Sequence, residues 1–473
     1  MKEKIKRFCG TLAVFALLVS LVCLSFVYMF SFRTSDKTKF DADDMQALAQ
    51  NFTAAGYMDH VDVKNILPVF VGASLADGEM RVGTFGGDTL EDMYEDCFEV
   101  VWQFLAQGRA QMLSEESTRD YIRMAKNGAF IYIKYAAAYP KSVIVSFTRK
   151  DTFTLNISDE YIKEIFVFNN TYTGNVCVLT VCDNGKNYIY TGEFGFDENF
   201  NKNIINEYNN AEGAFVFSFS SEKENDVFIS KEKFTDTVYS DAVIAEEEIF
   251  IQGIIFESVS RRLDMYASYD SLLSLFTLNP EKISVFTEND GTRTFFEEGQ
   301  NVSVTKDGAV TYSAVGTGGM YIGSVIGYSS ENSEYSLRDK IGATLCIANE
   351  LAQAMRLSKD IGIKLTGINY DENGSLVITY SVSFCGITVI CDEAFFSFTI
   401  SGNKIKSVVC NMFDATEYSE TQLPNAMWEL IGYAVSEETQ TYVSLVPAYL
   451  YTAEGENVFA HYFIAPEYGE AEK

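Results

Sequence analysis

The feature that most constrains this chain is an uncharged apolar run close to its N-terminus. Residues 8–32 read FCGTLAVFALLVSLVCLSFVYMFSF and contain no Asp, Glu, Lys or Arg. A helix of this length extends about 37 Å, enough to cross a hydrocarbon core of about 30 Å. A cleavable signal peptide has a shorter apolar region of about 7–15 residues and small residues at its cleavage site. This run ends in bulky side chains, so we expect an uncleaved transmembrane anchor, with a cleaved signal as the alternative.

The charges around the apolar run predict its orientation. Four basic residues, Lys2, Lys4, Lys6 and Arg7, precede it in a segment of only seven residues. Basic residues favour the cytoplasmic side of a membrane. We therefore expect residues 1–7 to form a cytoplasmic stub and residues 8–32 to cross the cell membrane once. The rest of the chain then lies outside the cytoplasm.

The composition describes a folded, strongly acidic body. The chain of 473 residues has a formal net charge of −30, although residues 1–39 hold seven Lys or Arg and only two Asp or Glu. Such a surface repels nucleic acid, so we expect no nucleic-acid partner, and plain solubility is its simplest explanation. Hydrophobic residues make up 47% and aromatic residues 14% of the chain, a composition that excludes extended disorder.

The cysteine pattern does not indicate a disulfide framework. The chain has nine cysteines, of which Cys9 and Cys23 lie in or beside the apolar run. The seven others cannot all pair within one chain, and most have apolar neighbours, where cysteine behaves as a small hydrophobic residue. A bridge between Cys177 and Cys182 around a short loop stays open.

Hydrophobic periodicity beyond the anchor predicts both helices and strands. Helical spacing is expected at 41–55, 90–113, 241–267, 337–357 and 423–434. Short β-type runs occur at 130–135, 143–147, 176–181 and 188–190. Asn-Gly, Asp-Gly or Gly-Asn pairs, which suit tight hairpin turns, occur at 184–185, 290–291, 307–308, 373–374 and 402–403.

Strand pairs interleaved with single helices predict an α+β fold, with a multidomain body of antiparallel sheets and packed helices. Breaks in the pattern at the polar stretch 220–226, the glycine-rich run 316–323 and the polar stretch 329–334 suggest the domain limits. We expect an N-terminal domain over 40–235, a middle domain over 236–330 and a C-terminal domain over 336–468.

No motif for catalysis or metal binding stands in a convincing context. His60 and His461 are the only histidines, and HExxH, paired CxxC and EF-hand patterns are absent from the sequence. His461 is expected in a C-terminal strand with a structural role, and His60 in a loop near the membrane. The glycines of 316–319 lack the strand and helix of a phosphate loop. We therefore predict no catalytic residue, no metal ligand and no cofactor.

Several segments in a fixed order resemble one known family. They occur at Leu275–Ile283, Asp290–Gly291, Gly308–Tyr312, Val382–Val389, Ile405–Val408 and Val446–Tyr449, with Phe130–Pro140 upstream. Together with the single anchor, this order resembles the YycH/YycI family of two-component system regulatory proteins. The chain has Gly386-Ile-Thr-Val389 where family members often have Gly-x-Pro-Val, and Tyr449 where Trp is commoner.

The resemblance implies a non-enzymatic regulator of a WalK-type sensor histidine kinase that controls cell-wall homeostasis in a Gram-positive bacterium. It also implies contacts between transmembrane helices and a second YycH/YycI-type protein as a further partner. Ala13, Ala16 and Ser20 fall near one face of a helix over 8–32, and small residues allow close helix packing in lipid. We expect these three residues to contact the partner, with simple anchoring as the alternative.

Two other functions are compatible with the residues alone. Scattered carboxylates would suit a cell-wall hydrolase, which needs two acids at a suitable distance. The 28 Tyr and 37 Phe would suit an extracytoplasmic module that binds peptide or glycan, although core packing also explains aromatic residues.

Overall fold

A computed structural model describes most of the chain beyond residue 65. The described residues are 66–74, 79–84, 87–147, 160–182, 185–194, 200–208, 215–218, 244–245, 251–259, 269–279, 281–306, 308–326, 335–391, 393–422, 443–452, 456–459 and 461–466. The expected anchor at 8–32, the expected helices at 41–55 and 423–434, and His60 lie outside them. No helix among the described residues is long and apolar enough to span a membrane.

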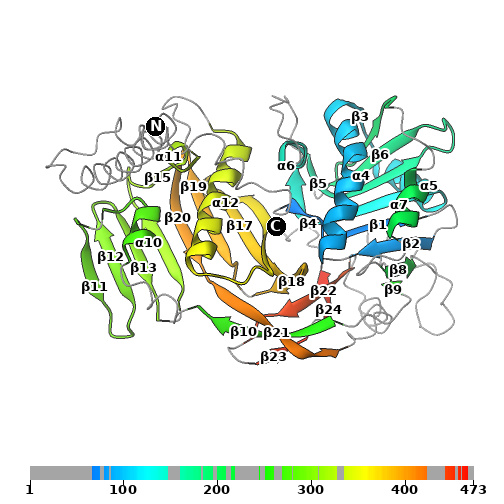
Figure 1. Ribbon diagram of the computed structural model, residues 1–473. Helices are drawn as coiled ribbons and strands as arrows, with labels where there is room; N and C mark the ends of the chain where they lie inside the picture. The colour runs from blue at the N-terminus through cyan, green and yellow to red at the C-terminus, as the bar shows by residue number, and fades with distance from the viewer. Residues whose placement is uncertain are drawn as a thin grey trace, which may run out of the picture.

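The first half of the described chain forms a nine-stranded antiparallel sheet (Figure 1). Its strands, in spatial order, are β3 (Arg109–Met112), β7 (Tyr188–Thr191), β6 (Val176–Cys182), β5 (Tyr161–Asn169), β4 (Phe130–Pro140), β1 (Phe70–Ser74), β2 (Glu79–Thr84), β8 (Phe215–Ser218) and β9 (Ile244–Ala245).

Helices cover both faces of this sheet. The helices are α4 (Gly87–Gln107), α5 (Glu115–Lys126), α6 (Lys141–Phe147) and α7 (Phe200–Tyr208). Ile131 and Ile133 belong to the core that includes α4, whereas Phe130 and Tyr132 belong to a separate core that includes Ile122 of α5. A strand buried on both faces needs a continuous apolar run, which explains why the central strands lack polar alternation.

The second half forms a larger sheet with twelve strands. Ten follow one spatial path: β11 (Ser284–Thr287), β12 (Arg293–Glu297), β13 (Gln300–Val304), β14 (Val310–Ala314), β20 (Lys404–Cys410), β19 (Phe396–Ser401), β17 (Leu376–Phe384), β18 (Ile387–Ile390), β22 (Val443–Leu450) and β24 (His461–Pro466). Two more lie off this path: β15 (Met320–Tyr321) pairs with β20, and β16 (Ile361–Tyr370) pairs with β17. All of these pairings are antiparallel except that between β18 and β22.

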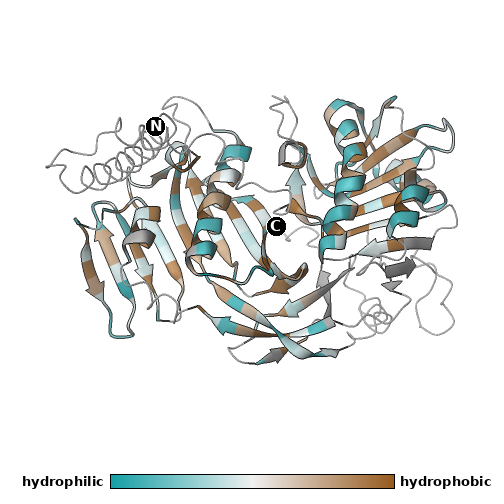
Figure 2. Cartoon of the chain, in the orientation of Figure 1, coloured by the Kyte–Doolittle hydropathy of each residue, from teal (hydrophilic) through white to brown (hydrophobic). Residues whose placement is uncertain are grey.

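One face of this second sheet is covered by helices and the other is partly open. The helices are α10 (Asp270–Leu275), α11 (Ile322–Ile326) and α12 (Leu337–Ala354). Phe396, Phe398 and Ile400 of β19 are buried while the residues between them are half-exposed. This alternation of hydrophobic and hydrophilic positions runs along several strands in Figure 2 and is the pattern of a sheet with one buried face.

A small third sheet connects the two halves at their base (Figure 1). It consists of β21 (Phe413–Gln422), β10 (Ile251–Ser258) and β23 (Asn457–Val458). β10 pairs along its whole length with β21, which follows it by more than a hundred residues.

The expected hairpins are confirmed. Each glycine of the five predicted turns, Gly185, Gly291, Gly308, Gly374 and Gly402, has a positive φ and lies between paired strands. Positive φ costs a side-chain-bearing residue energy that glycine does not lose.

The expected helix at 337–357 is also confirmed as α12, and that at 90–113 as α4, which ends earlier, at Gln107.

Two expected elements are wrong. The expected helix at 241–267 contains a strand, β10, because Ile254 and Phe256 are buried in a sheet made with a distant segment. The expected strand at 143–147 is part of helix α6, which begins directly after Pro140 and buries Val143, Ile144 and Val145 together. Short apolar runs fit a strand or a buried helix turn equally well, so tertiary packing decides between them.

The expected boundary between a middle domain at 236–330 and a C-terminal domain at 336–468 stays a prediction. Any such division has to accommodate a shared sheet, because β14 pairs with β20 from Val310↔Cys410 to Ser313↔Ser407. The boundary proposed at 220–226 lies outside the described residues.

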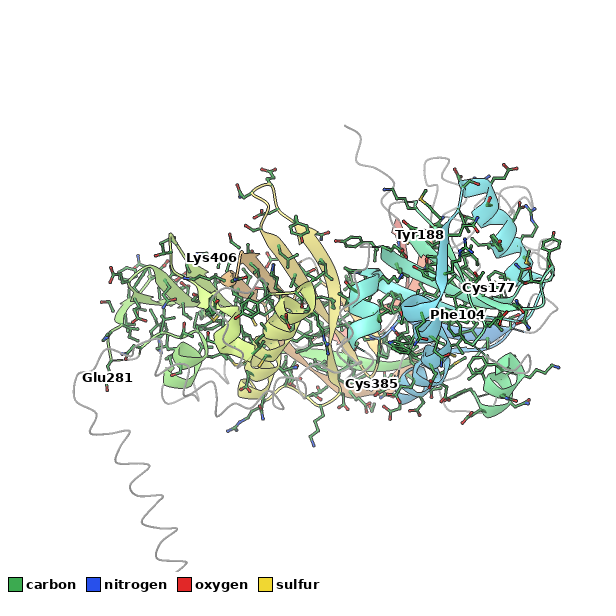
Figure 3. All side chains as sticks on the ribbon, turned by 90° about the horizontal axis from the view of Figure 1, so that it is seen from above. Phe104, Cys177, Tyr188, Glu281, Cys385 and Lys406 are labelled. Carbon is green, nitrogen blue, oxygen red and sulfur yellow. The ribbon has the colours of Figure 1, made fainter. Side chains whose placement is uncertain are left out.

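A bridge between Cys177 and Cys182 is excluded by their position. Both belong to the single extended strand β6, and both are free thiols. Five residues of strand separate their Cα atoms by roughly 16 Å, whereas a disulfide requires less than about 7 Å. Cys177 is labelled within this sheet in Figure 3.

Candidate functional site at the junction of the two sheets

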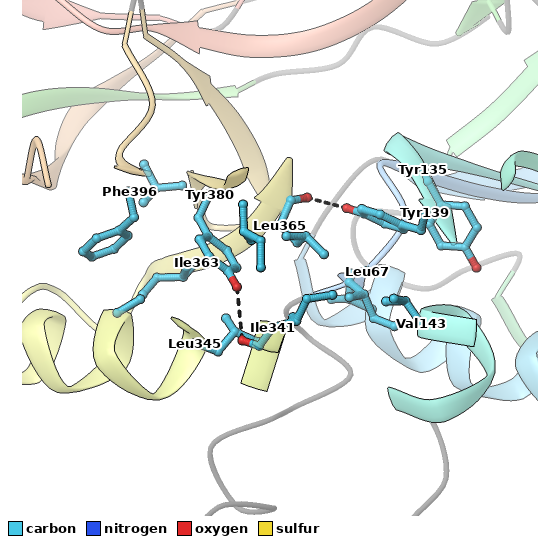
Figure 4. Close-up of a cluster of buried hydrophobic side chains, with 14 of the residues drawn as sticks. Leu67, Tyr135, Tyr139, Val143, Ile341, Leu345, Ile363, Leu365, Tyr380 and Phe396 are labelled. Atoms are coloured by element: carbon cyan, nitrogen blue, oxygen red, sulfur yellow. Dashed lines mark hydrogen bonds between the residues drawn. The ribbon is translucent and has the colours of Figure 1, made fainter. Parts of the chain in front are cut away.

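The residues predicted to contact a partner, Ala13, Ala16 and Ser20, lie outside the described residues. Within the described residues, buried polar and aromatic side chains gather where the two halves of the molecule meet. We define the junction as the end of β4 with α6 on one side, and β16 with α12 on the other. It is drawn in Figure 4.

A hydrogen bond across the junction joins the two large sheets. The hydroxyl of Tyr139, near the end of β4, donates to the backbone oxygen of Leu365 in β16. Both residues are buried, and the surrounding side chains from the two halves belong to one continuous apolar core. Leu67 and Val143 lie on one side of this core and Ile341 and Leu345 on the other.

Three tyrosines connect the junction to the interior of the first half. The hydroxyls of Tyr94 in α4 and Tyr135 in β4 lie 2.8 Å apart, and the ring of Tyr135 meets that of Tyr139 edge-on at 5.3 Å between centroids. Burial raises the pKa of all three hydroxyls above the usual range. They therefore stay neutral and act as hydrogen-bonding and packing groups.

A buried ionic cluster fixes the start of α6, one residue after β4. The ammonium of Lys141 donates to the hydroxyl of Tyr190 at 2.9 Å and lies 3.9 Å from a carboxylate oxygen of Glu160. The Tyr190 hydroxyl in turn donates to the other oxygen of Glu160. Burial lowers the pKa of Lys141, and the charge of Glu160 opposes that effect. The cluster links the start of α6 to β7 and to the residue before β5, and so restrains the neighbouring Tyr139.

On the other side of the junction, Lys364 supports β16. Its ammonium is buried and donates to the backbone oxygen of Gly386 at 3.0 Å. Burial lowers the pKa of Lys364 to about 8. Gly386 forms the turn between β17 and β18 with Cys385, and both have positive φ. Lys364 therefore braces this turn against the strand that carries Leu365.

Cys385 is exposed beside this turn, close to the first half of the molecule (Figure 3). Its thiol lies 3.8 Å from a carboxylate oxygen of Glu417. Partial burial, then the charges of Asp360, Glu417 and Asp88, raise the pKa of the thiol to about 11. Asp88 belongs to α4, so the junction brings acidic residues of both halves near one cysteine. A thiol of such high pKa is a poor nucleophile at neutral pH.

These contacts hold the two halves of the molecule together. The tyrosines and the thiol are held protonated, and the buried lysines are engaged in hydrogen bonds. No group of three or more His, Cys, Asp or Glu side chains among the described residues is arranged to hold a metal ion. His461 lies in β24, as expected, where its backbone pairs with Ala448.

Sequence reasoning identified the strand at 130–135 but not the junction. One signal was present in the sequence: the apolar run at 130–140 continues through Tyr135 and Tyr139 to Pro140. A strand end exposed to solvent would be expected to carry polar residues instead. The partner strand β16 follows more than two hundred residues later, and no local pattern links the two.

Comparison with known proteins finds a solved structure with a similar fold. No protein-family model matches the sequence, and no curated protein matches it. Among solved structures, YycH from Bacillus subtilis superposes with a TM-score of 0.50 and 12% sequence identity over 84% of this chain and 95% of that chain. Identity this low supports a statement about the fold alone. The chain has a YycH-like α+β fold, as the order of its sequence motifs indicates.

Proposed function

We propose that this protein is a membrane-anchored, non-enzymatic regulator of a sensor histidine kinase of the WalK type. The observation that carries the proposal is the YycH-like fold, which extends over most of the chain. The YycH/YycI resemblance implies that the kinase and a second protein of the same family are the partners. The uncharged run at 8–32 supports a single membrane crossing, with residues 1–7 inside and the body outside.

The junction suits a regulator of this kind. Two large sheets meet through one apolar core and a tyrosine–backbone hydrogen bond, and buried lysines stabilise the start of α6 on one side and the turn at Gly386 on the other. Regulatory proteins often transmit a signal by moving packed bodies relative to each other, because an interface has discrete packed arrangements. In this proposal the outer body changes the arrangement of the transmembrane helix, and the helix passes the change to the kinase helices.

The orientation is tested first. A single cysteine placed before residue 8 should be protected from a membrane-impermeant thiol reagent in intact cells. On the body, Tyr172→Cys should react, because Tyr172 is 88% exposed. Labelling of the N-terminal cysteine with protection of Tyr172→Cys would reverse the proposed topology.

The helix contact is tested by exchange of residues 8–32 for an unrelated transmembrane helix. We expect the protein to stay anchored and kinase output to change to that of a deletion strain. Kinase output that is unchanged by the exchange would contradict regulation through the helix.

Point substitutions test the individual residues. Leucine at Ala13, Ala16 and Ser20 together should reduce co-purification of the kinase, because larger side chains prevent close helix approach. Ser25→Leu is the matched control, since Ser25 lies on the opposite side of an ideal helix. An equal effect of both changes would leave simple anchoring as the role of the helix.

A further inference from the structure

The outer end of the large sheet is an open strand edge. β11 pairs with β12 on one side, and no described residue pairs with its other side. All four residues of β11 are exposed, including Val285 at 56% and Phe286 at 58% of their surface. Figure 3 shows Glu281, just before this strand, at the end of the molecule remote from Cys385 and the junction.

The edge lacks most of the features by which proteins usually prevent strands from pairing. Charged residues, proline, a bulge or a very short strand normally protect an exposed edge. Ser284–Thr287 contains no charge and no proline, and its pairing with β12 has no irregularity. Three other edge strands of the described chain carry such a feature: β3 begins with Arg109, β24 ends with Pro466, and β9 has two residues.

The hydrogen-bond pattern shows which backbone groups are available. The amide of Glu288 donates to the oxygen of Thr292, so even-numbered residues of this strand direct their backbone groups toward β12. Backbone direction alternates along a strand. The amides and carbonyls of Val285 and Thr287 therefore point outward, away from the sheet.

We propose that two copies of this chain pair antiparallel through β11, which joins their sheets into one continuous sheet across a two-fold axis. When this axis is perpendicular to the sheet, each face of one copy continues into the same face of the other. The odd-numbered residues of β11, whose backbone groups point outward, then lie opposite odd-numbered residues of the second copy. With Val285 opposite Val285 of the second copy, Ile283 faces Thr287 and Lys282 faces Glu288. All outward backbone groups then find partners, and each Lys282 meets an opposite charge.

The side chains on the open face support a second copy as the occupant. Phe286 and the 45% exposed Phe296 of β12 lie on the same face, because Ser284 pairs with Phe296 and Phe286 with Thr294. In the proposed register Phe286 faces Ser284 of the second copy. The four phenylalanines of two copies then surround the two Ser284 side chains, within the diagonal reach of aromatic residues across a sheet. Self-pairing thus buries the apolar surface that each monomer exposes.

Crosslinking tests the contact in the full-length protein in membranes. Val285→Cys should form a covalent dimer under mild oxidation, because opposed residues in a hydrogen-bonded pair lie about 5.5 Å apart at Cα, within disulfide range. Val315→Cys is the matched control, since Val315 is 67% exposed, somewhat more than Val285, but lies off the edge. The wild-type chain gives the background from Cys385. Crosslinking of Val285→Cys no faster than that of the control would overturn the proposal.

Substitutions that block backbone pairing test the mechanism. Light scattering of the detergent-solubilised full-length protein measures the protein mass after the mass of bound detergent is subtracted. Thr287→Pro removes an outward amide without affecting the bonds to β12, so it should weaken the dimer about tenfold or more. Phe286→Lys should act similarly, while Val315→Lys should have no effect. Unchanged circular dichroism confirms the fold. A dimer that survives Thr287→Pro pairs through another surface, such as the transmembrane helix, and contradicts the proposal.

A charge exchange tests the register. Lys282→Glu and Glu288→Lys should each weaken the dimer, and the double variant should restore it, because the two residues face each other across the axis. Restoration fails if the strands pair with Phe286 opposite Phe286, where Lys282 would face Asp290. Failure of restoration would overturn the proposed register. Mass and crosslinks that show only complexes with a different chain would overturn the proposed self-pairing.

Discussion

At the scale of single residues, the hydroxyl of Tyr139 makes a polar side-chain contact between β4 and β16. Tyr139→Phe removes it and leaves the buried oxygen of Leu365 without that donor, which should reduce stability by about 1–2 kcal/mol. The midpoint of denaturant unfolding of the full-length protein measures this loss. Tyr172→Phe is the control, since Tyr172 is 88% exposed and its change should fall within about 0.5 kcal/mol. Equal midpoints for both variants would contradict the described hydrogen bond.

The buried ammonium of Lys364 gives stability a specific pH dependence. Burial lowers its pKa from 10.5 to about 8. Below pH 8 the lysine is charged in both folded and unfolded states, so the full cost of burying the charge is present. Between pH 8 and 10.5 only the unfolded state binds the proton, so stability rises with pH in this window.

Lys364→Met removes this pH-dependent contribution. The buried charge costs about 3 kcal/mol, and the hydrogen bond to Gly386 returns about 1 kcal/mol. The methionine variant should therefore be more stable than wild type by about 2 kcal/mol at pH 7, and this advantage should disappear toward pH 10.5. Denaturant titrations at a series of pH values measure the difference between the two proteins. A difference independent of pH would show that Lys364 is not a desolvated cation.

At the scale of elements, α12 begins with a reciprocal capping box. The Ser336 hydroxyl accepts from the amide of Asp339, and the Asp339 carboxylate accepts from the amide of Ser336 at 3.0 Å. Ser336→Ala should lower the free energy of unfolding by about 1 kcal/mol. Ser336→Thr retains the acceptor and should change it by a few tenths of a kcal/mol at most. Thermal unfolding compares the two, and an equal loss in both would point to packing instead of capping.

At the scale of the whole molecule, the shared sheet predicts how the chain can be divided. A fragment over 236–330 loses the pairing of β14 with β20, and Val310 and Tyr312, both buried, lose their neighbours in β20. We expect this fragment to lack a cooperative thermal transition, whereas a fragment over 236–468 should retain one. Circular dichroism of both measures the outcome. Cooperative unfolding of the shorter fragment would support the boundary expected from the sequence.

The local features of this protein follow from its amino-acid sequence alone. Asn-Gly and Asp-Gly pairs predict the hairpins, because tight turns need residues with positive φ and this depends only on the two or three residues of the turn. The uncharged run at 8–32 predicts the anchor, and the acidic composition predicts that nucleic acid is not a partner; both stay predictions. The order of weak motifs also indicated the YycH-like fold that the comparison of structures shows.

The secondary structure of the short apolar runs depends on the tertiary fold. Residues 143–147 form a helix turn and 251–258 a strand because each run is stabilised by segments distant in the sequence. The junction between Tyr139 and Leu365, and the open edge of β11, have the same origin. Burial and strand pairing depend on which surfaces meet in space. Because hydrophobic contact is non-directional, a run of apolar residues predicts that it will be buried but does not predict which segment it packs against.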